Sequence, residues 1–145
     1  MAAKLSPRLK QIIEALPLKK EMRVLEIGCG PGAMAREISR RIDKGHILAI
    51  DRSPKAIQQA ISGSQTEIKT GRLSFSQVAI ENFTLKNDEE PFDIAIAVRV
   101  GALDGRHPEL EKQALLKISK ALTANGKLFI DGGTPLKEIS LDEYR

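Results

Sequence analysis

An acidic residue and three closely spaced glycines lie together near the start of the chain. Residues 24–32 read VLEIGCGPG, so Glu26 comes two positions before Gly28. An apolar strand that ends in a glycine turn and continues into a helix presents free N–H groups and a partial positive charge to a ligand. A carboxylate at the same rim favours a ligand that carries a cation and disfavours one that carries only phosphates.

Two cofactor classes are compatible with these glycines. Gly28, Gly30 and Ala33 satisfy the loose G-x-G-x-x-G/A pattern of dinucleotide-binding proteins, which would make the chain an NAD-dependent oxidoreductase. Glu26 and the third glycine at Gly32 favour the other class, because E-x-G-x-G-x-G resembles motif I of the class I S-adenosylmethionine-dependent methyltransferases. The resemblance implies that the three glycines line the amino-acid and ribose part of S-adenosylmethionine. It also implies that Glu26 faces the positive methionine end, the alternative being a salt bridge to a basic residue.

A second carboxylate closes the next predicted strand. Asp51 follows Gly32 by about 20 residues, where an acidic side chain can accept hydrogen bonds from both ribose hydroxyls in either cofactor class. Asp51 could instead cap the following helix, but Ser53 followed by Pro54 already supplies a good cap and leaves Asp51 for the ligand. Arg52 could lie against the adenine or remain solvated.

The resemblance also implies an adenine contact after the third strand. The matching stretch is residues 78–83, and the aspartate that family members use for the adenine amino group falls on Ala79. That hydrogen bond is therefore expected from Glu81 or from backbone, with Ile80 packed against the ring.

Ionisable residues are dense in the segment after the fourth strand, residues 99–108. Arg99 could bind a carboxylate of the substrate or the cofactor, and Asp104 and His107 could orient or deprotonate a nucleophile. Ordinary turn chemistry at Asp104 and a helix start after His107 are the alternatives. Methyl transfer requires a general base only when the nucleophile must lose a proton.

Apolar spacing and capping residues predict helices and strands in alternation, which favours a single domain over residues 1–145 with a doubly wound, parallel α/β sheet. The resemblance implies a Rossmann-like strand order of 3-2-1-4-5. The predicted strands are 22–27, 46–50, 72–78, 92–98 and 127–131, and the predicted helices are 5–16, 32–43, 53–63 and 108–124.

Little of the chain follows the fifth predicted strand. Family members normally continue into an antiparallel hairpin beside that strand, and residues 135–145 predict that most or all of it is lacking. An uncovered strand edge is prone to association. We therefore expect the C-terminal segment or a partner subunit, for example in a homodimer, to cover the edge.

Composition narrows the classes further. No apolar run is long enough for a membrane span or a secretion signal, and the single cysteine fits a reducing compartment, so a cytoplasmic protein is expected. A net charge of +4 with 3% aromatic residues favours solvated helix faces over nucleic-acid binding. The prediction is S-adenosylmethionine-dependent methyl transfer to a small-molecule acceptor, without a metal site. The alternatives are a non-catalytic, cofactor-binding partner subunit and the oxidoreductase.

Overall fold

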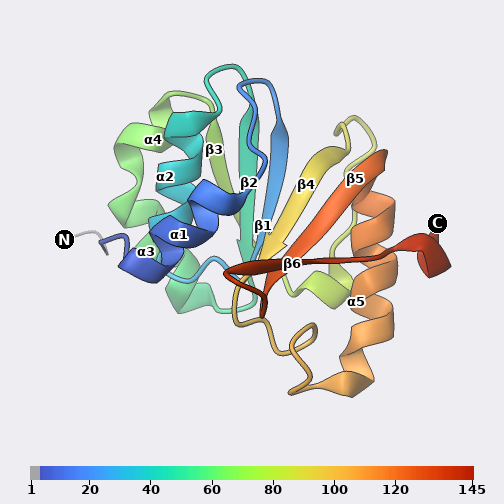
Figure 1. The fold of residues 1–145 in the computed structure, drawn as a ribbon. Coiled ribbons are helices and arrows are strands. Elements are labelled where there is room, and N and C mark those ends of the chain that lie inside the picture. The colour runs from blue at the N-terminus through green and yellow to red at the C-terminus, as the bar shows by residue number, and fades with distance from the viewer. Residues whose placement is uncertain (1–3) are drawn as a thin grey trace.

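Six strands form one mixed sheet in the computed structural model, which describes residues 4–145. Residues 1–3 belong to the N-terminal segment in which the sequence predicts no secretion signal, and they lie outside the described residues. The strand order is β3-β2-β1-β4-β5-β6 and the first five strands are parallel, which confirms the predicted doubly wound sheet and its order (Figure 1). The strands are β1 (Arg23–Ile27), β2 (His46–Asp51), β3 (Leu73–Gln77), β4 (Phe92–Ala97), β5 (Leu122–Asp131) and β6 (Leu136–Ile139).

Helices cover both faces of this sheet. The first four helices lie over one face and α5 lies over the other (Figure 1). The helices are α1 (Pro7–Ala15), α2 (Ala33–Arg41), α3 (Pro54–Gly63), α4 (Gln65–Lys69) and α5 (Pro108–Ala121), with short 3-10 turns η1 (Ile80–Asn82) and η2 (Asp142–Tyr144).

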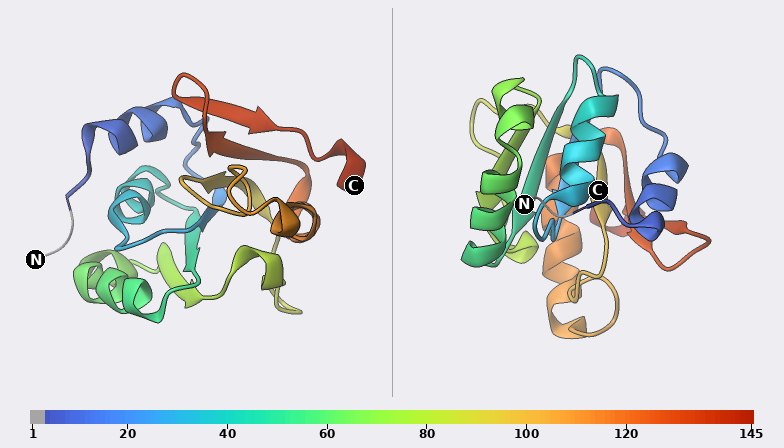
Figure 2. Two further views of the ribbon diagram at one scale, coloured as in Figure 1. Left: turned by 90° about the horizontal axis from the view of Figure 1, so that it is seen from below. Right: turned by 90° about the vertical axis from the view of Figure 1, so that its left-hand side faces the viewer.

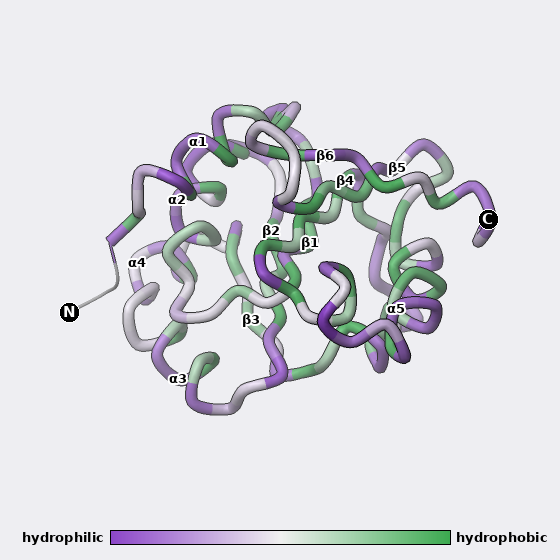
Figure 3. The backbone as a smooth tube through the Cα atoms, turned by 60° about the horizontal axis from the view of Figure 1, so that its bottom comes forward, coloured by the Kyte–Doolittle hydropathy of each residue, from purple (hydrophilic) through white to green (hydrophobic). Residues whose placement is uncertain are grey.

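Two apolar layers result from the alternation of side chains along the strands. In β1, Val24 packs in the layer under α1 and α2, whereas Leu25 and Ile27 pack in the layer under α5. Apolar residues accordingly predominate along the central strands, while the helices contain many hydrophilic residues (Figure 3). The same alternation turns Glu26 toward α2, the helix that the glycine turn introduces.

Helix starts follow the predicted caps. Ser6 and Ser53 accept hydrogen bonds from the backbone N–H groups of Leu9 and Ala56, and a proline follows each serine. Helix ends were harder to predict: α5 stops at Ala121 and β5 begins at once, although the apolar spacing continued further. Neither α4 nor η1 is predicted from the sequence, because each is a single short turn.

The predicted lack of a C-terminal hairpin is wrong. Residues 136–139 pair antiparallel with β5, with Leu128 opposite Ile139 and Asp131 opposite Leu136. The strand is only four residues long and has no buried residue, so it lacked a clear apolar alternation in the sequence. Leu141, which is 3% exposed, anchors the segment on the layer under α5. Of the two expected covers for the β5 edge, the C-terminal segment is the one observed.

Candidate functional site

Two adjoining cavities lie at the carboxyl edge of the parallel strands, the edge viewed in Figure 2, left. The first cavity has a volume of about 280 Å³ and lies between the ends of β1, β2 and β3 and the loop after β4. The second has a volume of about 500 Å³ and lies between the glycine turn and the segment that leads into α1. Gly28 and Arg99 line both cavities, so these two residues mark the wall that they share.

The glycine turn is shaped by close packing. Gly28 has φ +71°, and a Cβ at this position would lie 2.8 Å from Cγ2 of Val100. Gly32 has φ +90° and is buried; its Cβ would lie 3.1 Å from the Cβ of Ala60 and 3.1 Å from Arg36 Nη1. Gly28 lines both cavities, whereas Gly32 packs inward against α3 and lines neither of them.

Asp51 holds the glycine turn to the end of β2. Its Oδ2 accepts a hydrogen bond from the N–H of Gly30 at 2.9 Å, and its Oδ1 accepts one from the N–H of Ser53 at 2.9 Å. Ser53 caps α3 as predicted, yet Asp51 is less free than that cap suggested, because both oxygens already have a backbone donor. The half-buried carboxylate also lines the first cavity, where each oxygen retains a lone pair for a ligand hydroxyl.

Glu26 differs from Asp51 in its burial and in its hydrogen bonding. It is 3% exposed and lines the second cavity, and its Oε1 has no hydrogen-bond partner in the structure. The pKa of Glu26 is raised to about 8, chiefly by burial and also by the nearby Asp51, while Arg36 acts in the opposite direction. A buried carboxyl oxygen without a donor is energetically unfavourable, so this position is suited to a ligand that brings a cationic donor.

Arg36 is a buried cation on α2, 4% exposed, that the sequence analysis did not select. Its Nη1 donates to the carbonyl oxygen of Pro31 at 3.0 Å and to Oγ of Ser64 at 2.9 Å. It therefore ties the glycine turn to the junction of α3 and α4. Its distance from the glycine motif in the sequence is one helical turn, but nothing in the sequence distinguishes it from the exposed arginines that follow.

The far wall of the first cavity comes from the segment after β3. Ile80 is buried, and Glu81 and Ala79 line the cavity beside it, as does the exposed Arg52. The carbonyl oxygen of Glu81 accepts a hydrogen bond from Nε2 of Gln113, which fixes η1 against α5. The structure thus brings all the residues predicted for the adenine end to one wall.

Arg99 has a constrained backbone directly after β4. Its φ is +57°, the only positive value for a non-glycine residue among residues 4–145. Its N–H donates to Oδ1 of Asp131 at 3.0 Å, and its carbonyl oxygen accepts from Nη2 of Arg106 at 2.6 Å. Asp131 Oδ2 accepts from Nη2 of Arg8 at 2.8 Å, so one carboxylate joins α1 to this loop. Asp131 could have been noticed as an acidic residue ending a strand at the carboxyl edge; Arg8 and Arg106 gave no such signal.

The other two residues predicted for chemistry separate in the structure. His107 lines the first cavity, with its ring exposed. Asp104 lines neither cavity, because Nε of Arg106 binds its carboxylate at 2.9 and 3.0 Å. The hydrogen bond from Arg106 holds the pKa of Asp104 below its ordinary value. Asp104 is therefore positioned to shape the loop.

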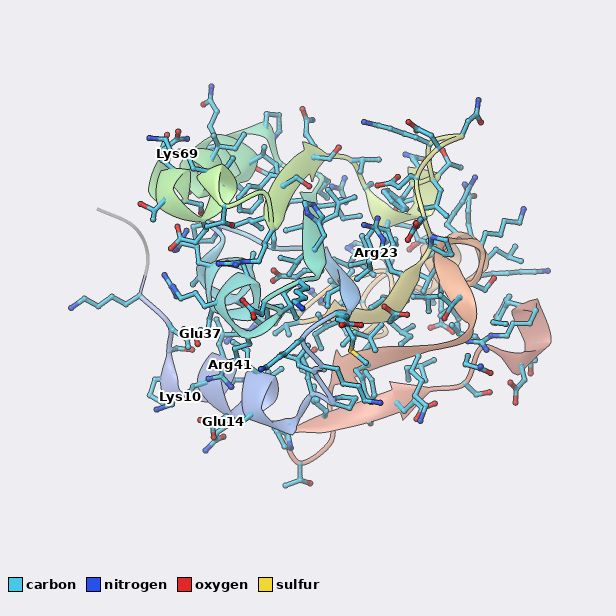
Figure 4. The ribbon with its side chains drawn as sticks, turned by 90° about the horizontal axis from the view of Figure 1, so that it is seen from above. Lys10, Glu14, Arg23, Glu37, Arg41 and Lys69 are labelled. Atoms are coloured by element: carbon cyan, nitrogen blue, oxygen red, sulfur yellow. The ribbon has the colours of Figure 1, made fainter. Side chains whose placement is uncertain are left out.

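Basic residues on α2 outside the cavities have acidic neighbours. Arg40 pairs with Glu37 at 3.1 Å and with Glu67 at 2.7 Å. Arg41 pairs with Glu37 at 3.0 Å, and both of these residues are labelled in Figure 4. These contacts fit the solvated helix face that the sequence predicts. Across residues 4–145, no helix has the length and apolar character to cross a membrane.

Known proteins share this architecture. The O-methyltransferase rstn1 of Aspergillus nomiae is 29% identical over 131 residues, which cover 90% of this chain and 57% of that protein. The malonyl-[acyl-carrier protein] O-methyltransferase of Bacillus cereus is 32% identical over 76 residues, covering 52% of this chain and 26% of that protein. A SAM-dependent methyltransferase of Geobacter sulfurreducens, in complex with S-adenosyl-L-homocysteine, has the same fold, with a TM-score of 0.66 at 20% identity over 87% of this chain and 48% of that one.

The chain thus spans little more than half of rstn1 and about a quarter of the Bacillus protein. A family model described as a methyltransferase domain matches residues 18–141, which include the glycine turn, Asp51 and the loop after β4. The chain belongs to this methyltransferase-domain family, and the resemblance to the class I S-adenosylmethionine-dependent enzymes is confirmed.

Proposed function

We propose that this protein binds S-adenosylmethionine and transfers its methyl group to a small-molecule acceptor. The observation that carries the proposal is the buried Glu26 oxygen, which lines the second cavity without a donor. The ammonium group of the methionine end supplies such a donor together with a positive charge. A pyrophosphate in the same place would instead face a carboxylate at low local dielectric.

The other contacts follow from the chemistry of the two cavities. Asp51 offers the remaining lone pairs of its oxygens to the ribose hydroxyls. Ile80 provides an apolar surface for the adenine, and Glu81 or the neighbouring backbone provides a polar partner. Gly28 lies where the two cavities meet, and the lack of a side chain there allows the ligand to pass from one to the other.

When bound, S-adenosylmethionine supplies a methyl group already activated by a sulfonium. The sulfur joins the adenosine and the methionine parts, so the shared wall at Gly28 and Arg99 is where an acceptor would meet the methyl group. The task of the protein is then to align two molecules and to exclude water. Two curated relatives are named as O-methyltransferases, which supports an oxygen as the methylated atom.

Ligand binding tests the proposal directly. Saturating S-adenosylmethionine should stabilise the protein against thermal unfolding, by about 2.7 kcal/mol at a hundred times its dissociation constant. NAD at the same concentration should produce no shift. A shift with NAD alone would reassign the chain to the oxidoreductases. Formation of S-adenosylhomocysteine over a panel of acceptors then distinguishes an enzyme from a cofactor-binding subunit.

We also propose a cytoplasmic location, which the single buried Cys29 supports. We also propose a homodimer or a partner subunit. An uncovered β5 edge no longer supports this proposal, because β6 pairs with that edge. Sedimentation of the purified protein measures this state.

A further inference from the structure

We propose that the acceptor is a carboxylic acid, bound through its carboxylate by Arg99 and methylated on a carboxylate oxygen to give a methyl ester. This inference rests on the proposed function and names the acceptor class for the same site. Three observations on residues 4–145 support it: Arg99 lies at the wall that both cavities share, Arg8 and Arg106 on either side of it are paired with aspartates, and the nearby groups that could act as a base are engaged or unsuited.

The backbone of Arg99 is held from both sides. Its N–H is bound by Asp131 and its carbonyl oxygen by Arg106, and the φ of +57° is unfavourable for a side chain of this type. Such backbone strain persists only where the surrounding contacts enforce it, and it is concentrated at functional sites. The constrained backbone fixes the start of a long side chain at the shared wall of the cavities.

Among residues 4–145, Arg99 is the only cation that lines both cavities, because Arg52 lines the first alone and Lys4 the second alone. Arg8 pairs with Asp131, and Arg106 pairs with Asp104, at distances of 2.8 and 2.9 Å. Within residues 4–145, no hydrogen bond or ion pair occupies the Arg99 side chain, which is exposed and lines both cavities. An arginine fork matches the two oxygens of a carboxylate and favours it over a neutral group.

The carboxylate of S-adenosylmethionine is expected to contact residues other than Arg99. Its amino and carboxylate groups are attached to the same carbon, so a donor whose ammonium binds Glu26 keeps its carboxylate in the second cavity. Lys4 and the start of α2 at Ala33 line that cavity too and suit an anion. Arg99 lies at the boundary, nearer to the expected methyl position, and is therefore assigned to the acceptor.

Of the described residues that line the second cavity, none is suited to deprotonate an acceptor. Burial raises the pKa of Cys29, which makes its thiol a poor source of thiolate. Glu26 is expected to bind the donor, and Asp104 is held by Arg106. His107 lines only the first cavity, where its N–H backbone donates to Gly101 and its ring faces solvent.

A carboxylate needs no base, because it is ionised at neutral pH. An oxygen lone pair forms the new bond to the methyl carbon while the carbon–sulfur bond breaks. The electron pair of that bond stays on sulfur, which becomes the neutral thioether of S-adenosylhomocysteine. The products are a neutral methyl ester and S-adenosylhomocysteine, no proton is released, and no further reactant is required.

The test uses the full chain with methyl-labelled S-adenosylmethionine. The acceptor probes are malonate, succinate, trans-aconitate and benzoate, with malonamide, catechol and benzylamine as probes without a carboxylate. Mild alkali releases methanol from a methyl ester but leaves ethers and methylamines intact. The expected result is label transfer to one or more acids, recovered as volatile methanol. Label found only in alkali-stable products would overturn the carboxylate assignment while leaving methyl transfer established.

Arg99→Gln provides the second measurement. It should raise the KM for the acid that reacts, or its dissociation constant from the protein loaded with S-adenosylhomocysteine, by about 10- to 100-fold. The dissociation constant for S-adenosylmethionine should change less than about threefold. Arg41→Gln, which removes the same charge from the outer face of α2, should change neither.

Three further outcomes would contradict the inference. A large loss of S-adenosylmethionine affinity in Arg99→Gln would show that Arg99 serves the donor. Equal binding of the acids to Arg99→Gln and to the unmodified protein would remove Arg99 from acceptor recognition. Absence of any binding of the four acids to the protein loaded with S-adenosylhomocysteine would overturn the acceptor class, whereas failure to bind S-adenosylhomocysteine itself would overturn the proposed function instead.

Discussion

Asp51 and Glu26 are acidic residues on the neighbouring strands β2 and β1, and they line adjoining cavities. They differ in burial and in hydrogen bonding. Asp51 is half-buried, and each of its oxygens accepts a backbone hydrogen bond. Glu26 is buried, and one of its oxygens has no donor. The first carboxylate therefore contributes to the fold before any ligand arrives, whereas the second is costly until a cation binds.

The difference separates a residue that supports the fold, Asp51, from one that is expected to act in ligand binding, Glu26. Asp51 organises the glycine turn, so its loss should affect both the free protein and the complex. Glu26 is expected to act only in the complex, because in the free protein its charge is desolvated and incompletely compensated. Variants at the two positions should therefore differ in how they distribute their effects between stability and affinity.

The largest effect is expected for Glu26→Gln. The affinity for S-adenosylmethionine should fall by at least about 100-fold, because the ammonium would be buried without its counter-charge. At pH 7.5 the free variant should be more stable than the unmodified protein, by on the order of 2 kcal/mol, since the shifted carboxyl is gone. Calorimetric titration and urea unfolding measure the two quantities, with Glu14→Gln on α1 as the control. Equal affinity would remove Glu26 from the site.

Asp51→Ala should weaken binding by about 1.5–3 kcal/mol, through the loss of charge-assisted hydrogen bonds to the ribose. In contrast to Glu26→Gln, it should also destabilise the free protein by about 1–2 kcal/mol, because the N–H groups of Gly30 and Ser53 lose their acceptor. Both are measured as above. A variant with weaker binding and unchanged stability would contradict the structural half of the comparison.

Arg36→Met tests the buried cation that supports the glycine turn and acts on Glu26. The carbonyl of Pro31 and the hydroxyl of Ser64 would lose a charged donor, so the protein should be less stable by about 2 kcal/mol. The pKa of Glu26 should rise further, because Arg36 opposes the effect of burial. Arg40→Met is the matched control on the exposed face of the same helix. The unfolding midpoint and the pH profile of cofactor binding report the two effects separately.

The pH dependence of stability and that of affinity should have opposite signs. Glu26 ionises near pH 8 in the folded protein and near pH 4.5 when unfolded, so its contribution to the unfolding free energy should decrease as the pH rises between these values. Binding of the ammonium requires the ionised form, so affinity should increase by about tenfold between pH 6 and pH 7. Glu26→Gln should abolish both slopes, and persistence of either slope would assign it to another group.

The smallest effect is expected for Arg8→Gln. The Arg8 side chain is 54% exposed in its pair with Asp131, and exposed pairs contribute about 0–1 kcal/mol. The unfolding free energy should therefore change by less than about 1 kcal/mol. A larger change would show that the contact between α1 and the end of β5 is as important to the fold as the Asp51 network.

Much of the fold could be predicted because its signals are local. The apolar strands, the serine caps and the glycine turn each depend on neighbouring residues, and they predict the alternation of strands and helices, whereas the order of the strands was implied by the family resemblance. The errors lie where partners distant in sequence decide the outcome. Residues 136–139 have little strand character of their own and become a strand only against the edge of β5.

The same distinction applies to the site. Glu26, Gly28 and Asp51 belong to a pattern with fixed spacing, and the structure brings them to one edge. The buried state of Arg36 and the bridging role of Asp131 depend on contacts between remote segments. No feature of residues 34–41 indicates which arginine turns inward. Asp104 was selected for its chemistry, and its pairing with Arg106 in a short loop could not be inferred from residue type.

The turn between β5 and β6 has a consequence for how such a domain can diversify. It follows Asp131 directly, and residues 132–135 line an open hollow together with one side of α1. Surface turns tolerate inserted residues far better than strands do. Sequence added at this point would extend over the mouth of the cleft without altering the sheet, which makes the turn a natural place to graft new acceptor selectivity.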